Sequence, residues 1–135
     1  MSFDLLVSRF EDGEPALFQS SVLVREIEPY VVETTPKWFE LRFPDEAGCT
    51  VFADTASVEM DGFNVNRPCD SPQLYEALLA ILKTPGMVLV MPSECPPLIG
   101  LVDAADHLPA DIVEALGKPV LLRSASEILQ RIRES

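Results

Sequence analysis

The middle of the chain alternates between apolar and polar residues, which is the pattern of half-buried β-strands. Segment 38–43 (WFELRF) turns three apolar side chains to one face, those of Phe39, Leu41 and Phe43. Turn-forming residues occupy 44–48, and segment 49–53 then predicts a partner strand. A third strand is expected at 57–66. These segments together predict an antiparallel β-meander.

The third of these strands changes its apolar face partway along. Val58 and Met60 stand at even positions, whereas Phe63 and Val65 stand at odd positions. Because a slip of one residue turns every later side chain to the opposite face, we expect a β-bulge at residues 61–62.

Helical spacing predicts a helix in the second half of the chain. Ser71 and Pro72 form an N-cap followed by proline at the first helical position, and residues 84–86 (TPG) end the helix. Its buried stripe consists of Leu74, Ala77, Leu78, Ile81 and Leu82. The unbroken apolar segment 87–91 (MVLVM) follows and predicts a strand buried on both faces.

Shorter elements are expected towards both ends. Segment 3–10 (FDLLVSRF) predicts a first strand that ends at the turn residues 11–15. Ser20 and Ser21 can cap a short helix, which Pro29 breaks. The stripe of that helix is Leu23, Ile27 and Tyr30.

The C-terminal third alternates loops, strands and helices. A rigid loop is expected at 92–97, with strands at 98–102 and 119–122. A helix at 109–116 should turn three residues inward, namely Ile112, Val113 and Leu116. Ser124 and Glu127 form a capping box for a last helix, with Ile128, Leu129 and Ile132 buried.

Meander strands mixed with helices favour the α+β class. We predict a single domain over residues 1–135, with a mainly antiparallel β-meander sheet and three to four helices packed mostly on one face. The other face of the meander is then left without cover.

Negative charge dominates the composition. The chain has 22 acidic and 10 basic residues, a net charge of −12. Residues 1–66 hold 13 of the acids and four of the bases. This balance argues against nucleic acid and against an anionic membrane surface as partners, and it favours fast association with a basic partner. Solubility alone is the other reason for an acidic surface.

The residues that could carry catalysis are few and scattered. Cys49, Cys69 and Cys95 form no paired motif, and His107 is the one histidine. Glycine-rich phosphate loops and metal-binding motifs are absent from the sequence. We therefore expect no catalytic residue, metal or cofactor, and a cytoplasmic protein with free thiols that has neither a signal peptide nor a membrane span.

The polar face of the meander is the best candidate for a partner-binding site. Asparagine is disfavoured in strands, yet two asparagines alternate with apolar residues at 63–66. Tryptophan and arginine are common interface anchors. The candidates are Trp38, Glu40, Arg42, Asn64, Asn66 and Arg67, beside Thr50, Phe52, Glu59 and Asp61. The alternative is structural, with Trp38 packed under a helix and the asparagines finishing an edge strand.

Three segments carry a resemblance to known proteins. Residues 1–16 (MSFDLLVSRFEDGEPA), 62–68 (GFNVNRP) and 107–119 (HLPADIVEALGKP) resemble a family of small uncharacterised bacterial proteins, similar in style to immunity proteins of polymorphic toxin systems. The resemblance implies a binding protein and assigns no chemical role to any residue.

These observations predict a non-enzymatic, acidic binding protein that occludes a protein partner, such as a basic toxin domain, through the exposed face of the meander. Two other functions stay open. One is a small hydrolase or ligand-binding enzyme that uses Cys69, Cys95 or His107. The other is a self-associating structural protein in which the meander face forms a homodimer.

Overall fold

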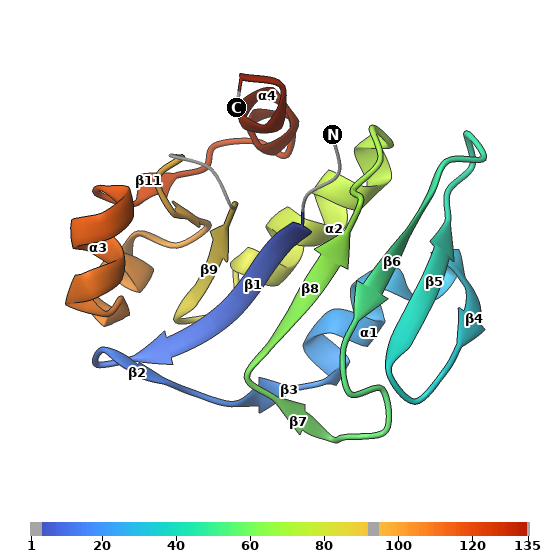
Figure 1. The fold of residues 1–135 in the computed structure, drawn as a ribbon, viewed down its shortest axis with the longest axis horizontal. Coiled ribbons are helices and arrows are strands. Elements are labelled where there is room, and N and C mark those ends of the chain that lie inside the picture. Colours follow the sequence, from blue (N-terminus) through green and yellow to red (C-terminus); the bar gives the residue numbers. More distant parts are fainter. Residues whose placement is uncertain (1–3, 92–94, 135) are drawn as a thin grey trace.

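The strands assemble into a twisted, mainly antiparallel sheet (Figure 1). The computed structural model describes residues 4–91 and 95–134. Residue 3 of the expected first strand and residues 92–94 of the expected loop at 92–97 lie outside the described residues. Within the described part, nine strands form the main sheet in the order β11-β10-β9-β1-β8-β6-β5-β4, with β2 attached to β1. They are β1 (Asp4–Glu11), β2 (Glu14–Pro15), β4 (Val31–Thr34), β5 (Trp38–Arg42), β6 (Gly48–Phe52), β8 (Gly62–Asn66), β9 (Met87–Val90), β10 (Leu98–Ile99) and β11 (Val120–Leu121).

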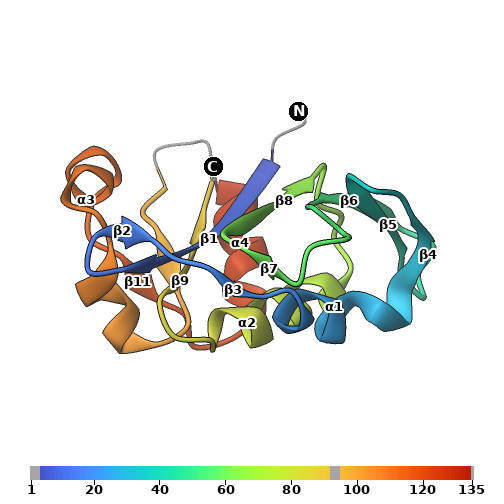
Figure 2. The same cartoon turned by 90° about the horizontal axis from the view of Figure 1, so that it is seen from below.

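Helices pack along most of one face of this sheet and over part of the other. The helical elements are α1 (Ser21–Ile27), η1 (Glu28–Tyr30), α2 (Pro72–Leu82), η2 (Val102–His107), α3 (Ala110–Leu116) and α4 (Ser126–Glu134). Figure 2 shows α1 and α2 along one face, with α3 on the opposite side at the β9 end. The predicted α+β class, with a mainly antiparallel sheet and about four helices, is confirmed.

Two apolar clusters fill the two sides of the sheet. The larger one lies under α1 and α2 and contains Leu5, Val7, Leu89 and the buried stripe of α2. The smaller one joins Val88 and Ile99 to the underside of η2. Strand β9 is therefore buried on both faces, as the segment MVLVM predicts.

The region after the first strand differs from the prediction. Helix α1 ends at Ile27, and Pro29 stands in the 3₁₀ turn η1, so Tyr30 is not part of the α-helical stripe. The edge strand β4 then follows, which the sequence did not predict. A register shift between Val31 and Glu33 breaks the alternation that would have marked it.

The β-bulge expected at residues 61–62 is wrong. The chain leaves the main sheet there: β7 (Glu59–Met60) pairs with β3 (Phe18–Gln19) in a separate two-stranded sheet, and β8 begins at Gly62 in the main sheet. A change of sheet reverses the apolar parity just as a bulge does, because the two strand pieces face different neighbours.

Three predictions in the second half also need correction. Of the residues expected to be buried in the last helix, Ile128 is buried, whereas Leu129 and Ile132 are half-buried. The strand expected at 98–102 is shorter, because the 3₁₀ helix η2 begins at Val102. The helix at 109–116 turns no fully buried residue inward; Ile112, Val113 and Leu116 are only half-buried.

The predicted helix caps are also only partly correct. The hydroxyl of Ser71 donates to Asp45 instead of capping α2, and this hydrogen bond lowers the pKa of the Asp45 carboxyl. Of the capping box before α4, only the Glu127 half forms: Glu127 Oε1 accepts from the Ser124 N–H at 3.1 Å.

Candidate functional site

On the side away from α1 and α2, no described residue forms a covering layer over the part of the sheet beyond the reach of η2 and α3. We call this surface the open face. It is formed by alternate residues of four adjacent strands: Asp4, Leu6 and Ser8 of β1, Asn64 and Asn66 of β8, Thr50 and Phe52 of β6, and Trp38, Glu40 and Arg42 of β5. Their neighbours Leu5 and Val7 are completely buried under the helices, whereas Leu6 is 47% exposed.

An apolar row crosses the open face at right angles to the strands. Strand register places Leu6 beside Asn64, Asn64 beside Phe52, and Phe52 beside Trp38. The rings of Trp38 and Phe52 meet edge to face with their centroids 6.1 Å apart. Leu6 and Phe52 are 47% and 40% exposed, so two large apolar side chains stand open in water within one row.

A polar row runs directly beside the apolar one. It pairs Asp4 with Asn66, Asn66 with Thr50, and Thr50 with Glu40. Asn66 Nδ2 donates to Asp4 Oδ1 at 2.7 Å, and the Thr50 hydroxyl donates to Glu40 Oε2 at 2.9 Å. Both carboxylates thus have neutral donors as partners, and neither belongs to an ion pair in the described part of the chain. The row keeps its negative charge.

Asn64 connects the two rows and is held there at a cost in stability. Its Nδ2 donates to Asp4 Oδ2 at 2.9 Å. Its Oδ1 is buried and has no hydrogen-bond partner among the described residues. An unsatisfied buried acceptor costs roughly 1–3 kcal/mol, and asparagine fits strands poorly. A polar residue that weakens the fold at a central strand indicates a role in function.

We expect Asn64→Val to raise the free energy of unfolding by about 1 kcal/mol, because valine removes the orphaned acceptor and suits the strand better. Urea unfolding measures the change. Asn66→Val is the matched control, because Asn66 donates to the same carboxylate but has no orphaned buried oxygen among the described residues. If Asn64→Val destabilises the fold as much as Asn66→Val does, the cost assigned to Asn64 is wrong.

Five of the six main candidate residues lie on the open face. They are Trp38, Glu40, Arg42, Asn64 and Asn66. Arg67 is exposed at a left-handed position (φ 51°) where the chain leaves β8. Glu59, expected on the same face, lies in the two-stranded sheet with β3.

The structure contradicts the structural alternative, in which Trp38 packs under a helix and the asparagines finish an edge strand. Trp38 is only half-buried and packs on Phe52 rather than under a helix. The asparagines lie in β8, which pairs with β1 and β6 and is not an edge strand.

The sequence pattern did not indicate the contribution of the first strand to this face. Asp4, Leu6 and Ser8 stand at every second position, but the segment FDLLVSRF does not alternate cleanly in polarity. Their membership follows only from the pairing of β1 with β8, about 60 residues away along the chain.

The residues of the enzyme alternative have separate surroundings. The Asp12 N–H donates to His107 Nδ1 at 3.1 Å, so the histidine holds the β1–β2 turn. The carbonyl of Cys69 accepts from the Tyr75 hydroxyl, and Cys69 also contacts Cys49. Cys95 lies by Arg131 of α4, and burial raises the pKa of its thiol. No recorded contact between His107 and a cysteine exists in the described part of the chain.

Comparison with known protein families, with curated proteins and with solved structures finds no match for this chain. Among residues 4–91 and 95–134, no helix has the length and apolar character needed to cross a bilayer. The same residues contain no cluster of three or more histidine, cysteine or acidic side chains placed to hold a metal ion.

Proposed function

We propose that this chain is a non-enzymatic binding protein, similar in its mode of action to toxin immunity proteins, whose open face covers a basic surface of a protein partner. The observation that carries the proposal is the pair of rows on that face, one with exposed apolar side chains, the other acidic and without an ion pair among the described residues.

The two rows supply the two ingredients of a specific interface. Trp38, Phe52 and Leu6 offer apolar area that a partner can remove from water, and aromatic side chains dominate interface energetics. Asp4 and Glu40 offer negative charge at a fixed position, which steers a basic partner and sets its register. The net charge of −12 extends the same attraction over the whole chain.

Capture of partners from a lysate of the source cell, on the immobilised chain at low salt, tests this function. We expect a basic protein to bind and to be released as salt screens the charges. With the purified partner, Trp38→Ala should raise the Kd about 5- to 150-fold, which corresponds to 1–3 kcal/mol at an interface anchor.

Val102→Ala is the control, because Val102 is also an exposed apolar residue but lies on η2. A partner that binds the Trp38→Ala variant as tightly as the natural chain contradicts the proposal. Sedimentation at increasing concentration tests the homodimer alternative, which the like charges of two facing polar rows disfavour.

A further inference from the structure

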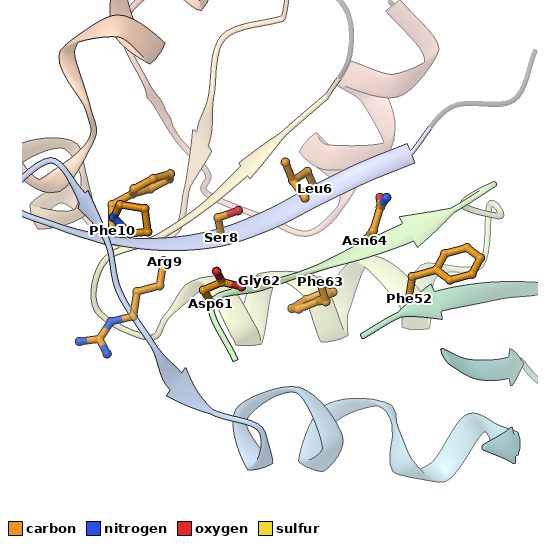
Figure 3. A pocket seen from close by; sticks show the side chains of 10 residues that line it. Leu6, Ser8, Arg9, Phe10, Phe52, Asp61, Gly62, Phe63 and Asn64 are labelled. Atoms are coloured by element: carbon orange, nitrogen blue, oxygen red, sulfur yellow. The ribbon is translucent and has the colours of Figure 1, made fainter. Parts of the chain in front are cut away.

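The open face contains a depression where the layer of η2 and α3 ends. It encloses about 390 Å³ and is lined by both strands of the β1–β8 pair (Figure 3). Its floor is the cross-strand pair of Ser8 and Gly62. Leu6, Phe10 and Phe52 are larger lining residues.

The small pair at the floor explains the hollow. A Cβ added to Gly62 would stand 2.7 Å from the Val7 carbonyl oxygen and 3.1 Å from the Ser8 hydroxyl, so no side chain fits there without displacing the backbone of β1. Large side chains stand before and after this pair in the pleat. The result is an open slot bordered by the apolar side chains of Leu6, Phe10 and Phe52.

Hydrogen-bond acceptors stand along the slot. Asp61 presents an exposed carboxylate that belongs to no ion pair among the described residues, and it lines the same depression as Ser8 (Figure 3). Asn64 lines the end near Phe52, although its orphaned oxygen is buried. Arg9 also lines the depression, but its guanidinium donates to the carbonyls of Pro85 and Leu17. Asp61 is therefore a lining carboxylate that no described cation neutralises in an ion pair.

From these features we infer that the slot receives an arginine side chain of the basic partner, an inference that rests on the proposed function. The aliphatic part of the arginine lies along Leu6 and Phe52, and its guanidinium reaches Asp61 and the Ser8 hydroxyl. A guanidinium suits this place better than an ammonium. It is flat, it is more weakly hydrated, and it stacks on aromatic rings while donating in its own plane.

The test is an NMR titration of the full chain with N-acetyl-arginine methylamide. We expect saturable shifts of the backbone amides of Ser8, Gly62 and Asn64. The citrulline analogue has nearly the same shape without the charge, and it should bind at least about tenfold more weakly because it loses the charge-assisted hydrogen bond. Asp61→Asn should weaken the arginine probe by a similar factor. Asp106→Asn, a change at an exposed carboxylate of η2 outside the slot, should leave it unchanged.

Each other outcome overturns the inference. Shifts that do not saturate, or that spread over the whole acidic surface, mean general attraction without a slot. If the citrulline analogue binds equally well, the slot does not recognise the charge. If a third probe, N-acetyl-lysine methylamide, binds equally well, the assignment to arginine is wrong. None of these results touches the Trp38→Ala test on the captured partner, so the slot can fail while the proposed function stands.

Discussion

Replacing Gly86 by alanine is expected to lower the free energy of unfolding by about 2–5 kcal/mol, because two separate costs meet at this position. Its φ of 79° lies in the left-handed region, which costs an alanine roughly 1–2 kcal/mol. A Cβ there would also stand 2.4 Å from the Phe10 carbonyl oxygen, and such overlap in a packed region costs roughly 1–3 kcal/mol. Urea unfolding measures the sum.

Two other glycines separate these costs. Gly13 has a φ of 83° and nothing within 4 Å of an added Cβ, so Gly13→Ala carries the backbone cost alone. Gly100 lacks the left-handed φ, but its Cβ would stand 2.6 Å from the Leu82 carbonyl oxygen, so Gly100→Ala carries the steric cost alone. The loss at Gly86 should be close to the two losses together. A loss no larger than that of Gly13→Ala would contradict the argument.

Gly86 also connects the fold to the open face. Its carbonyl accepts from the Phe10 N–H at 2.9 Å, which fixes the end of β1 against the turn before β9. Phe10 forms part of the slot wall. A shift of this turn therefore moves the slot as well as the core.

The sequence predicted those features that depend on local pattern. The helix at 72–82, the buried strand after it and the two central meander strands all have unambiguous periodicity, and each is found. The open face is also consistent with the prediction that most helices pack on one side.

The remaining features depend on pairing between distant segments. The parity change near Gly62 fits both a bulge and a change of sheet, and only the pairing of β7 with β3 decides between them. Likewise, no local pattern places β1 between β8 and β9, yet this pairing brings Asp4 to both asparagines and Ser8 to Gly62. The slot is a product of tertiary pairing, and its small floor pair cannot be recognised in either segment alone.

Raising the pH above about 9 is expected to destabilise the fold through Cys49, by roughly 4 kcal/mol between pH 9 and 12. Burial on the helix side of β6, together with the neighbouring Cys69 thiol, raises the pKa of Cys49 from 9.0 to about 12. Between these values the unfolded chain has lost the thiol proton and the folded chain retains it. The contribution of this thiol to the free energy of unfolding is therefore fully present below pH 9, and it falls by about 1.4 kcal/mol for each further pH unit up to 12. Burial also raises the pKa of Tyr75, which steepens the fall at the alkaline end.

Urea unfolding at a series of alkaline pH values, on the natural chain and on Cys49→Ala, isolates the contribution of this thiol. The variant keeps the general repulsion of an acidic chain but loses the titrating group, so its stability should fall less steeply between pH 9 and 12. Cys95→Ala is the matched control; the Cys95 thiol is only half-buried and should change the slope less. Equal slopes for the natural chain and Cys49→Ala would mean that Cys49 ionises in the folded state as freely as in the unfolded chain. That result would contradict the burial of Cys49 on the helix side of β6, behind Thr50 and the polar row.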